Sequence, residues 1–182
     1  MKPIDMSNVT EAGDFDRPAA GAYICGIYSA EDVSEKEYLK ITYDIIEGDY
    51  KGYYKQLRED HPDWSWSGVY IRSYKEKARG IFKRFCSAVS KSNGNYVFDA
   101  GNVNHDEKTL RGKKVGLVLQ EEEYRANDGS VKTRLIVNKE FPISDIDKQK
   151  IPDIKKLEEP AAGSDADGWV NIPDGLPEEI AF

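Results

Sequence analysis

The 182-residue sequence predicts a mainly β protein of five antiparallel strands, with one helix between the third and fourth strands. Three observations support this fold class. Residues 37–46 alternate between apolar and polar side chains, residues 75–92 repeat their apolar side chains at helical spacing, and Asp128-Gly129 separates two further alternating runs. A period of two is typical of a half-buried strand, a period near 3.6 of a helix, and Asp-Gly of a hairpin turn.

The first three strands are expected between residues 22 and 57. AYICGIYSAEDV (22–33) is rich in aromatic and β-branched residues, and EYLKITYDII (37–46) follows it. In the second run, one face holds Leu39, Ile41, Tyr43 and Ile45, and the other holds Tyr38, Lys40, Thr42 and Asp44. Glu47-Gly48-Asp49 signals a turn, and we expect KGYYKQL (51–57) to return as the third strand. The polar, aromatic-containing residues 58–74 match no regular pattern.

The helix and the last two strands follow. The helical stripe consists of Ala78, Ile81, Phe82, Phe85, Ala88 and Val89, and Asn93-Gly94 ends it. Residues 110–125 and 131–141 predict the two remaining strands. This order matches the OB-fold, a small, partly open Greek-key barrel. We assign residues 1–20 to a flexible lead-in, 21–156 to an OB-fold domain and 157–182 to a disordered acidic tail.

Charge is distributed unevenly along the chain. Of 33 acidic residues, seven lie in residues 157–182, which contain no Lys or Arg, so residues 1–156 hold 26 acidic and 26 basic residues. Within this neutral body, residues 51–91 carry ten basic and four acidic residues. The overall charge of −7 therefore does not argue against a nucleic-acid partner.

Residues typical of catalysis or metal binding are not grouped in this sequence. Cys25 and Cys86 are expected to be buried free thiols, and no phosphate-binding GxxxxGK[ST] loop occurs. His105, Asp106 and Glu107 are adjacent and would point apart on any regular element, so we expect a solvated loop there. We predict no catalytic residues, no metal and no cofactor. The sequence shows no secretory leader and no apolar run near the roughly 20 residues of a membrane span, so we expect a cytoplasmic protein.

Aromatic and basic residues are interleaved between the second predicted strand and the helix. Trp64 and Trp66 lie in the polar stretch DWSWSG, outside any apolar period. Aromatic rings can stack on unpaired bases of any kind while Lys and Arg contact phosphates, and an OB-fold offers its second and third strands for this purpose. The candidate DNA-binding residues are Tyr38, Lys40, Tyr53, Tyr54, Lys55, Trp64, Trp66, Tyr70 and Arg72.

Other interpretations remain open at this point. The two tryptophans could fold back and cap the barrel, in which case the chain could be a protein-interaction module that never contacts DNA. A small metal-dependent nuclease using Asp and Glu residues is the enzyme alternative.

The sequence resembles the phage-encoded single-stranded DNA-binding proteins and a neighbouring phage family of replication or recombination proteins. The resemblance spans residues 20–142 and lies in LKITYDIIEGDYKGYY, GIFKRFCSAVSKSNG and LRGKKVGLVLQEEEY. It implies an OB-fold protein that coats single-stranded DNA in the infected host, possible self-assembly, and partners in replication or recombination. A recombination mediator or annealing factor on the same fold is the alternative within this class.

The end of the sequence, GLPEEIAF, adds a second point of resemblance. Bacterial and many phage single-stranded DNA-binding proteins end in acids, apolar residues and a terminal Phe. Here Ala181 stands where proline is usual, and glutamates stand where aspartates are usual. The resemblance implies that a tip formed by Glu178, Glu179, Ile180 and Phe182 docks on partner proteins.

Overall fold

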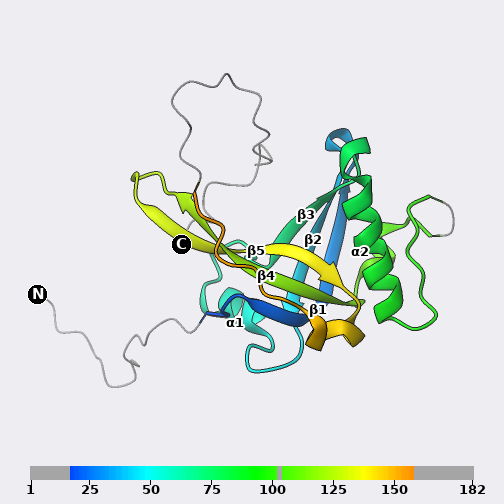
Figure 1. The fold of residues 1–182 in the computed structure, drawn as a ribbon, viewed down its shortest axis with the longest axis horizontal. Coiled ribbons are helices and arrows are strands. Elements are labelled where there is room, and N and C mark those ends of the chain that lie inside the picture. The colour runs from blue at the N-terminus through cyan, green and yellow to red at the C-terminus, as the bar shows by residue number, and fades with distance from the viewer. Residues whose placement is uncertain (1–16, 102–103, 158–182) are drawn as a thin grey trace, which may run out of the picture.

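The computed structural model of the chain describes residues 17–101 and 104–157. Within these ranges the chain forms one antiparallel sheet with two α-helices and four short 3-10 helices (Figure 1). The strands are β1 (Gly21–Val33), β2 (Tyr38–Ile45), β3 (Val69–Ser73), β4 (Lys114–Arg125) and β5 (Val131–Phe141). The helices are α1 (Tyr53–Asp60), α2 (Arg79–Ser92), η1 (Ser34–Lys36), η2 (Glu76–Ala78), η3 (Glu107–Leu110) and η4 (Ile143–Lys148). The predicted mainly β class and the helix after the third strand are confirmed.

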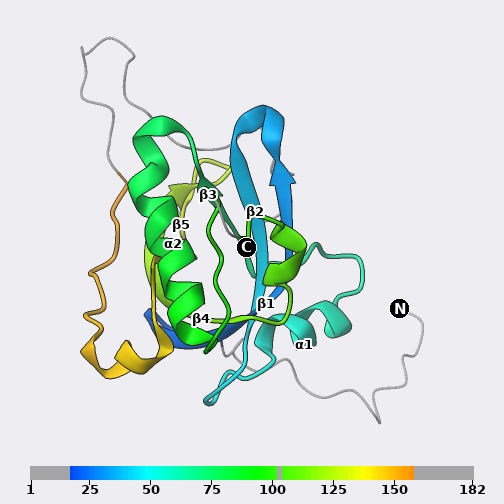
Figure 2. The same cartoon turned by 90° about the vertical axis from the view of Figure 1, so that its right-hand side faces the viewer.

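The strands of the sheet are arranged in the order β3-β2-β1-β4-β5. Read from β4, the first four strands have the spatial order 4-1-2-3, which is a Greek key. β3 and β5 are the two edges, and the sheet is not closed into a barrel by backbone pairing between them. α2 contacts β3, β4 and β5, so it lies across the side of the sheet where these two edges approach each other (Figure 2).

The prediction of a third strand at residues 51–57 is wrong, because this segment enters α1. The Asp44 carboxylate, at the end of β2, accepts the backbone N–H groups of Tyr54 at 3.0 Å and Lys55 at 3.1 Å. The first N–H groups of a helix lack partners within the helix, and an Asp carboxylate that accepts them stabilises the helix start. The third strand is β3 instead, inside the segment that showed no regular pattern.

The core forms between the inward face of the sheet and α2. Leu39, Ile41, Tyr43 and Ile45 of β2 are all buried, as their alternation predicted. Phe82, Phe85, Ala88 and Val89 of α2 are also buried, and Cys25 and Cys86 are buried free thiols, as predicted. Ile81 is an exception, with 48% of its surface exposed. It precedes Phe82 by one residue, which turns its side chain about 100° away from the core-facing line.

Residues 149–157 run beside β4 and β5 in Figure 1, and Lys155 pairs with Glu122 of β4 in a parallel bridge beyond the end of the β1 pairing. Gln120 donates its side-chain amide to the carbonyl of Asp153 at 2.7 Å, and Glu123 donates its N–H to the carbonyl of Lys155 at 2.8 Å. Partial burial alone would raise the pKa of Glu122, but hydrogen bonds from Lys155 and Arg134 outweigh it and lower that pKa. Val118 and Gln120, which lie outside the core cluster, are both buried on this side of the sheet.

None of the helices within the described ranges is long and apolar enough to cross a membrane.

A buried ion pair links the two edge strands. Arg72 of β3 donates its Nε to the carboxylate of Glu140 on β5, and its Nη2 to the carbonyl of Val137 at 3.3 Å. The exposed fractions of the Arg72 and Glu140 side chains are 13% and 0%. Arg84 of α2 places its Nε 3.8 Å from the second carboxylate oxygen. Glu140 thus joins β3, β5 and α2 through side chains where no backbone ladder joins them.

We predict that Glu140→Ala lowers the free energy of unfolding by about 3–5 kcal/mol, because it leaves the guanidinium of Arg72 buried without its partner. Urea-induced unfolding would measure this change. Glu121→Ala is the matched control, since it removes a partly exposed ion pair with Arg17 and is expected to cost at most about 1 kcal/mol. Equal losses in the two variants would show that the edge strands do not depend on Glu140.

Candidate functional site

The outward side of β2 and β3 forms a continuous surface that mixes aromatic, aliphatic and basic side chains. Cross-strand pairing places Tyr38 beside Ser73, Lys40 beside Ile71 and Thr42 beside Val69. All six side chains are partly exposed, and we refer to them as the outer face. The predicted outward orientation of Tyr38, Lys40 and Thr42 is therefore confirmed, while Asp44, expected on the same side, is buried as the cap of α1.

A stacked pair of rings borders the outer face at its α1 end. The ring centroids of Tyr28 and Trp66 are 4.8 Å apart with an interplanar angle of 28°. Tyr28 belongs to β1 and Trp66 precedes β3, so the two rings meet across β2, which lies between those strands. Tyr28 remains 52% exposed. One side of this pair therefore faces solvent next to the outer face.

Tyr28 was not among the residues predicted from the sequence. The register of β1 against β2 shifts between Ile27 and Ser29, which leaves Tyr28 as the extra residue of a β-bulge. Such a bulge changes the direction in which side chains point. The alternation of Tyr23, Cys25 and Ile27 toward the core was a signal that Tyr28 points outward, but the sequence does not indicate its partner.

The position of Trp66 is fixed by contacts with the backbone of β2. Its indole Nε1 donates a hydrogen bond to the carbonyl of Tyr43 at 2.9 Å, and the N–H of Tyr43 donates to the carbonyl of Gly68 at 2.8 Å. A Cβ atom at Gly68 would lie 2.4 Å from the Tyr43 carbonyl oxygen. The close approach of this loop to β2 therefore requires glycine at position 68.

Trp64, the other tryptophan of the loop, stacks on His61 with centroids 3.7 Å apart and an interplanar angle of 8°. Arg58 donates hydrogen bonds to the carbonyls of Pro62 and Trp64. Both tryptophans are thus partly exposed, and each is held by a second ring. The polar residues around the two tryptophans in the sequence belong to a loop that folds back on itself next to the sheet.

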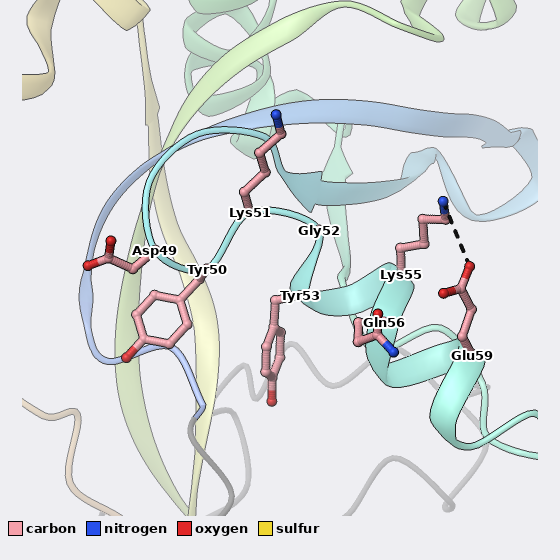
Figure 3. Close-up of a pocket in the computed structure, with 8 residues that line it drawn as sticks. All are labelled: Asp49, Tyr50, Lys51, Gly52, Tyr53, Lys55, Gln56 and Glu59. Carbon is pink, nitrogen blue, oxygen red and sulfur yellow. Dashed lines mark ion pairs between the residues drawn. The ribbon is translucent and has the colours of Figure 1, made fainter.

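α1 moves two predicted binding residues away from the outer face. Tyr53 and Lys55 line a shallow hollow beside the turn that leads into α1, together with Tyr50 and Lys51 (Figure 3). Tyr50 and Tyr53 lie side by side in this hollow, with ring centroids 6.4 Å apart. Lys55 forms an exposed ion pair with Glu59 at 3.7 Å. The sequence placed Tyr53 and Lys55 on a third strand. This placement is wrong, because the Asp44 carboxylate caps the start of a helix there.

Three other predicted residues lie inside the protein. Tyr54 and Tyr70 pack edge-on against Tyr43, with ring centroids at 5.2 and 5.6 Å. Burial raises the pKa of all three tyrosines, and for Tyr70 the nearby Glu140 carboxylate raises the pKa further. Arg72 is occupied by Glu140. In this conformation Tyr54, Tyr70 and Arg72 support the surface from below and do not form part of it.

The Asp44 carboxylate connects the core to α1. Its pKa is raised because partial burial disfavours the charged form more than the hydrogen bonds from Tyr54, Lys55 and Ile45 favour it. The hydrogen bonds from Tyr54 and Lys55 to Asp44 hold one end of the long connection between β2 and β3. The hydrogen bond from Trp66 to the carbonyl of Tyr43 holds the other end. Both ends are attached to the last residues of β2.

The described residues contain no group of three or more His, Cys, Asp or Glu side chains that could hold a metal ion. The partner-binding tip predicted at Glu178, Glu179, Ile180 and Phe182 lies outside the described residues, as do most of the predicted lead-in and tail. Comparison with protein-family models gives no match, and comparison with curated protein sequences gives none either.

We predict that Gly68→Ala lowers the free energy of unfolding by about 1–3 kcal/mol, because the added methyl group overlaps the Tyr43 carbonyl. The displaced loop should also change the emission of Trp66. Gly80→Ala is the matched control: its added Cβ meets nothing within 4 Å, and alanine suits the first turn of α2, where Gly80 lies. Thermal unfolding and tryptophan fluorescence would measure both variants, and an unchanged Gly68→Ala protein would contradict the close approach.

Proposed function

We propose that this protein binds single-stranded DNA without strong sequence preference, through the outer face and the Tyr28–Trp66 pair. One observation carries the proposal. On β4 the side chains of Val118 and Gln120 are buried, whereas β2 and β3 present aromatic and aliphatic side chains beside Lys40. A partly exposed sheet face of this composition suits unpaired bases, which offer flat apolar surfaces next to negative phosphates.

We further propose that the sheet is an OB-fold. The Greek-key order, the helix after β3 and the approach of β3 to β5 agree with a partly open five-stranded barrel. In that fold the second and third strands bind oligonucleotides, and in this protein those strands carry the outer face. The resemblance to phage single-stranded DNA-binding proteins supports the same proposal and suggests a role in phage replication or recombination.

Each component of the surface has a defined physical role in this proposal. Tyr28 offers an exposed ring whose orientation is fixed by Trp66, so little side-chain entropy is lost when a base stacks on it. Tyr38 offers a second ring at the opposite end of the outer face. Lys40 lies between them on β2 and contacts phosphate. Stacking accepts any base, which accounts for binding without sequence preference.

We predict that oligo-dT quenches the tryptophan fluorescence of the protein at low salt and that added salt reverses this quenching.

Tyr28→Ala should weaken binding by about 5- to 150-fold, the equivalent of one lost stacking contact of 1–3 kcal/mol. Lys40→Ala should reduce the slope of log affinity against log salt by about 0.7. A titration at several salt concentrations measures both effects.

Tyr124→Ala serves as the aromatic control, because Tyr124 lies on the β4–β5 hairpin and its ring packs under Arg134. Its affinity should equal that of the wild-type protein. Absence of quenching by micromolar oligo-dT would refute DNA binding and favour a protein-interaction module. Cleavage of the strand in the presence of magnesium would favour the nuclease alternative.

We propose that residues 158–182 contact other replication or recombination proteins and do not take part in DNA binding. Their seven acidic residues and absence of basic residues make attraction to phosphate unfavourable. Truncation after Glu158 is therefore expected to leave the affinity for oligo-dT unchanged or to raise it. A marked loss of affinity in the same titration would place this segment in the DNA site.

A further inference from the structure

A groove between α2 and β5 forms a second basic surface, distinct from the outer face. Its α2 side is lined by Arg84, Ser87 and Lys91, and its β5 side by Lys139 and Phe141. We refer to this hollow as the α2 groove. Its floor is partly apolar, and its cations come from two different elements that are fixed against each other by the core.

Two of the three cations that line the α2 groove have no acidic partner among the described residues, and the third, Arg84, approaches only Glu140. Lys91 and Lys139 form no ion pair with any residue in the described ranges. Of the two acids that line the groove, Asp145 is paired with Lys148 at 2.7 Å and Glu140 with Arg72. The groove therefore keeps a positive charge that the described protein does not neutralise.

The buried carboxylate of Glu140 also bears on this groove. Its Oε2 accepts no hydrogen bond from the described residues and lies 3.8 Å from Nε of Arg84. Arg84 is 46% exposed, so this attraction holds one side of its guanidinium while leaving part of the group in solvent. The carboxylate thus positions a cation at the groove.

The spacing of the cations favours an extended anion over a small one. Arg84 and Lys91 are seven residues apart on α2, which separates them by about 10 Å along the helix axis. A single phosphate or carboxylate does not span that distance, but a nucleic-acid backbone does.

The groove is also close to the outer face. Arg72 on β3 lies between Ile71 and Ser73, two residues of the outer face, and its guanidinium reaches Glu140, which lines the groove. The two surfaces therefore adjoin across the narrow seam between β3 and β5. A strand leaving the outer face at β3 reaches the groove after crossing this seam.

We infer that the α2 groove binds the phosphate backbone of the same single strand that occupies the outer face, so that longer strands wrap across the β3–β5 seam. This inference rests on the proposed function and adds a second contact region to it. The groove supplies charge, and the outer face supplies stacking. Affinity should therefore increase with strand length beyond the footprint of the outer face.

The test uses the full chain, the Lys91→Ala/Lys139→Ala double variant, and oligo-dT of about 10 and about 30 nucleotides, since one OB-fold covers roughly 4–16 nucleotides. The double variant should bind the long strand about tenfold or more weakly, with a salt slope reduced by about 1.4 for two lost phosphate contacts. Its affinity for the short strand should be unchanged. Lys108→Ala/Lys156→Ala, which removes two exposed lysines elsewhere, should match the wild type at both lengths.

The outcomes separate this inference from the proposed function. Absence of binding by the wild-type chain would refute both. Wild-type binding with an unchanged double variant, or an equal loss at both lengths, would refute only the second contact region. An acidic peptide of residues 158–182 that binds the wild type but not the double variant, with the long-strand salt slope unchanged, would assign the groove to a protein ligand instead.

Discussion

The buried pair of Arg72 and Glu140 is the interaction on which the geometry of this sheet depends. β3 is short, and backbone hydrogen bonds connect it to β2 only. Without a link on its other side, an edge strand of five residues would be free to move away from the core. The guanidinium reaches a carboxylate and a carbonyl of β5 at the same time, which fixes the separation of the two edges. The outer face depends on this link because half of it lies on β3.

The outward surface of the sheet differs between β4 and the strands β2 and β3. Residues 149–157 run beside β4, with hydrogen bonds to the side chain of Gln120 and to the backbone near Glu122. Over β2 and β3 the described residues place the Tyr28–Trp66 pair at one end and leave the six side chains of the outer face partly exposed. Covering apolar surface is favourable by about 25 cal/mol per Å². A surface that keeps aromatic and aliphatic groups in contact with solvent forgoes that stabilisation and can gain it on binding a ligand.

The sequence predicted those elements whose pattern is local. Aromatic and β-branched composition identified β1, alternation identified β2, β4 and β5, and the helical period identified α2, because each of these patterns is local to one element. It could not predict α1, since the Asp44 side chain that starts this helix lies ten residues away, at the end of another element. Without α1, KGYYKQL looks like a strand, and the true third strand, VYIRS, is too short to show a clear period.

The predicted site was limited in the same way, because a local sequence pattern does not show contacts between distant residues. Tyr53 and Tyr54 are neighbours with similar sequence surroundings, yet one lines a surface hollow and the other lies in the core. A helix turns by about 100° per residue, so adjacent aromatic side chains must differ in direction once α1 forms. Composition predicted an aromatic and basic region between residues 50 and 91. Which rings reach solvent depends on tertiary contacts such as the bulge at Tyr28 and the approach of Gly68 to Tyr43.

The charge pattern of α2 is difficult to explain by the stability of the helix itself. Arg79 and Lys83 are like charges four residues apart, an arrangement that costs roughly 0.2–0.5 kcal/mol, and cations near a helix N-terminus oppose the helix dipole. Only Lys91, in the last turn, is favourably placed with respect to that dipole. The buried side chains of Phe85 and Val89 offset these small costs, so the helix tolerates the pattern without benefiting from it. A bound polyanion would offset this repulsion, so the proposed contact of α2 with phosphates would remove a small cost that the helix otherwise bears.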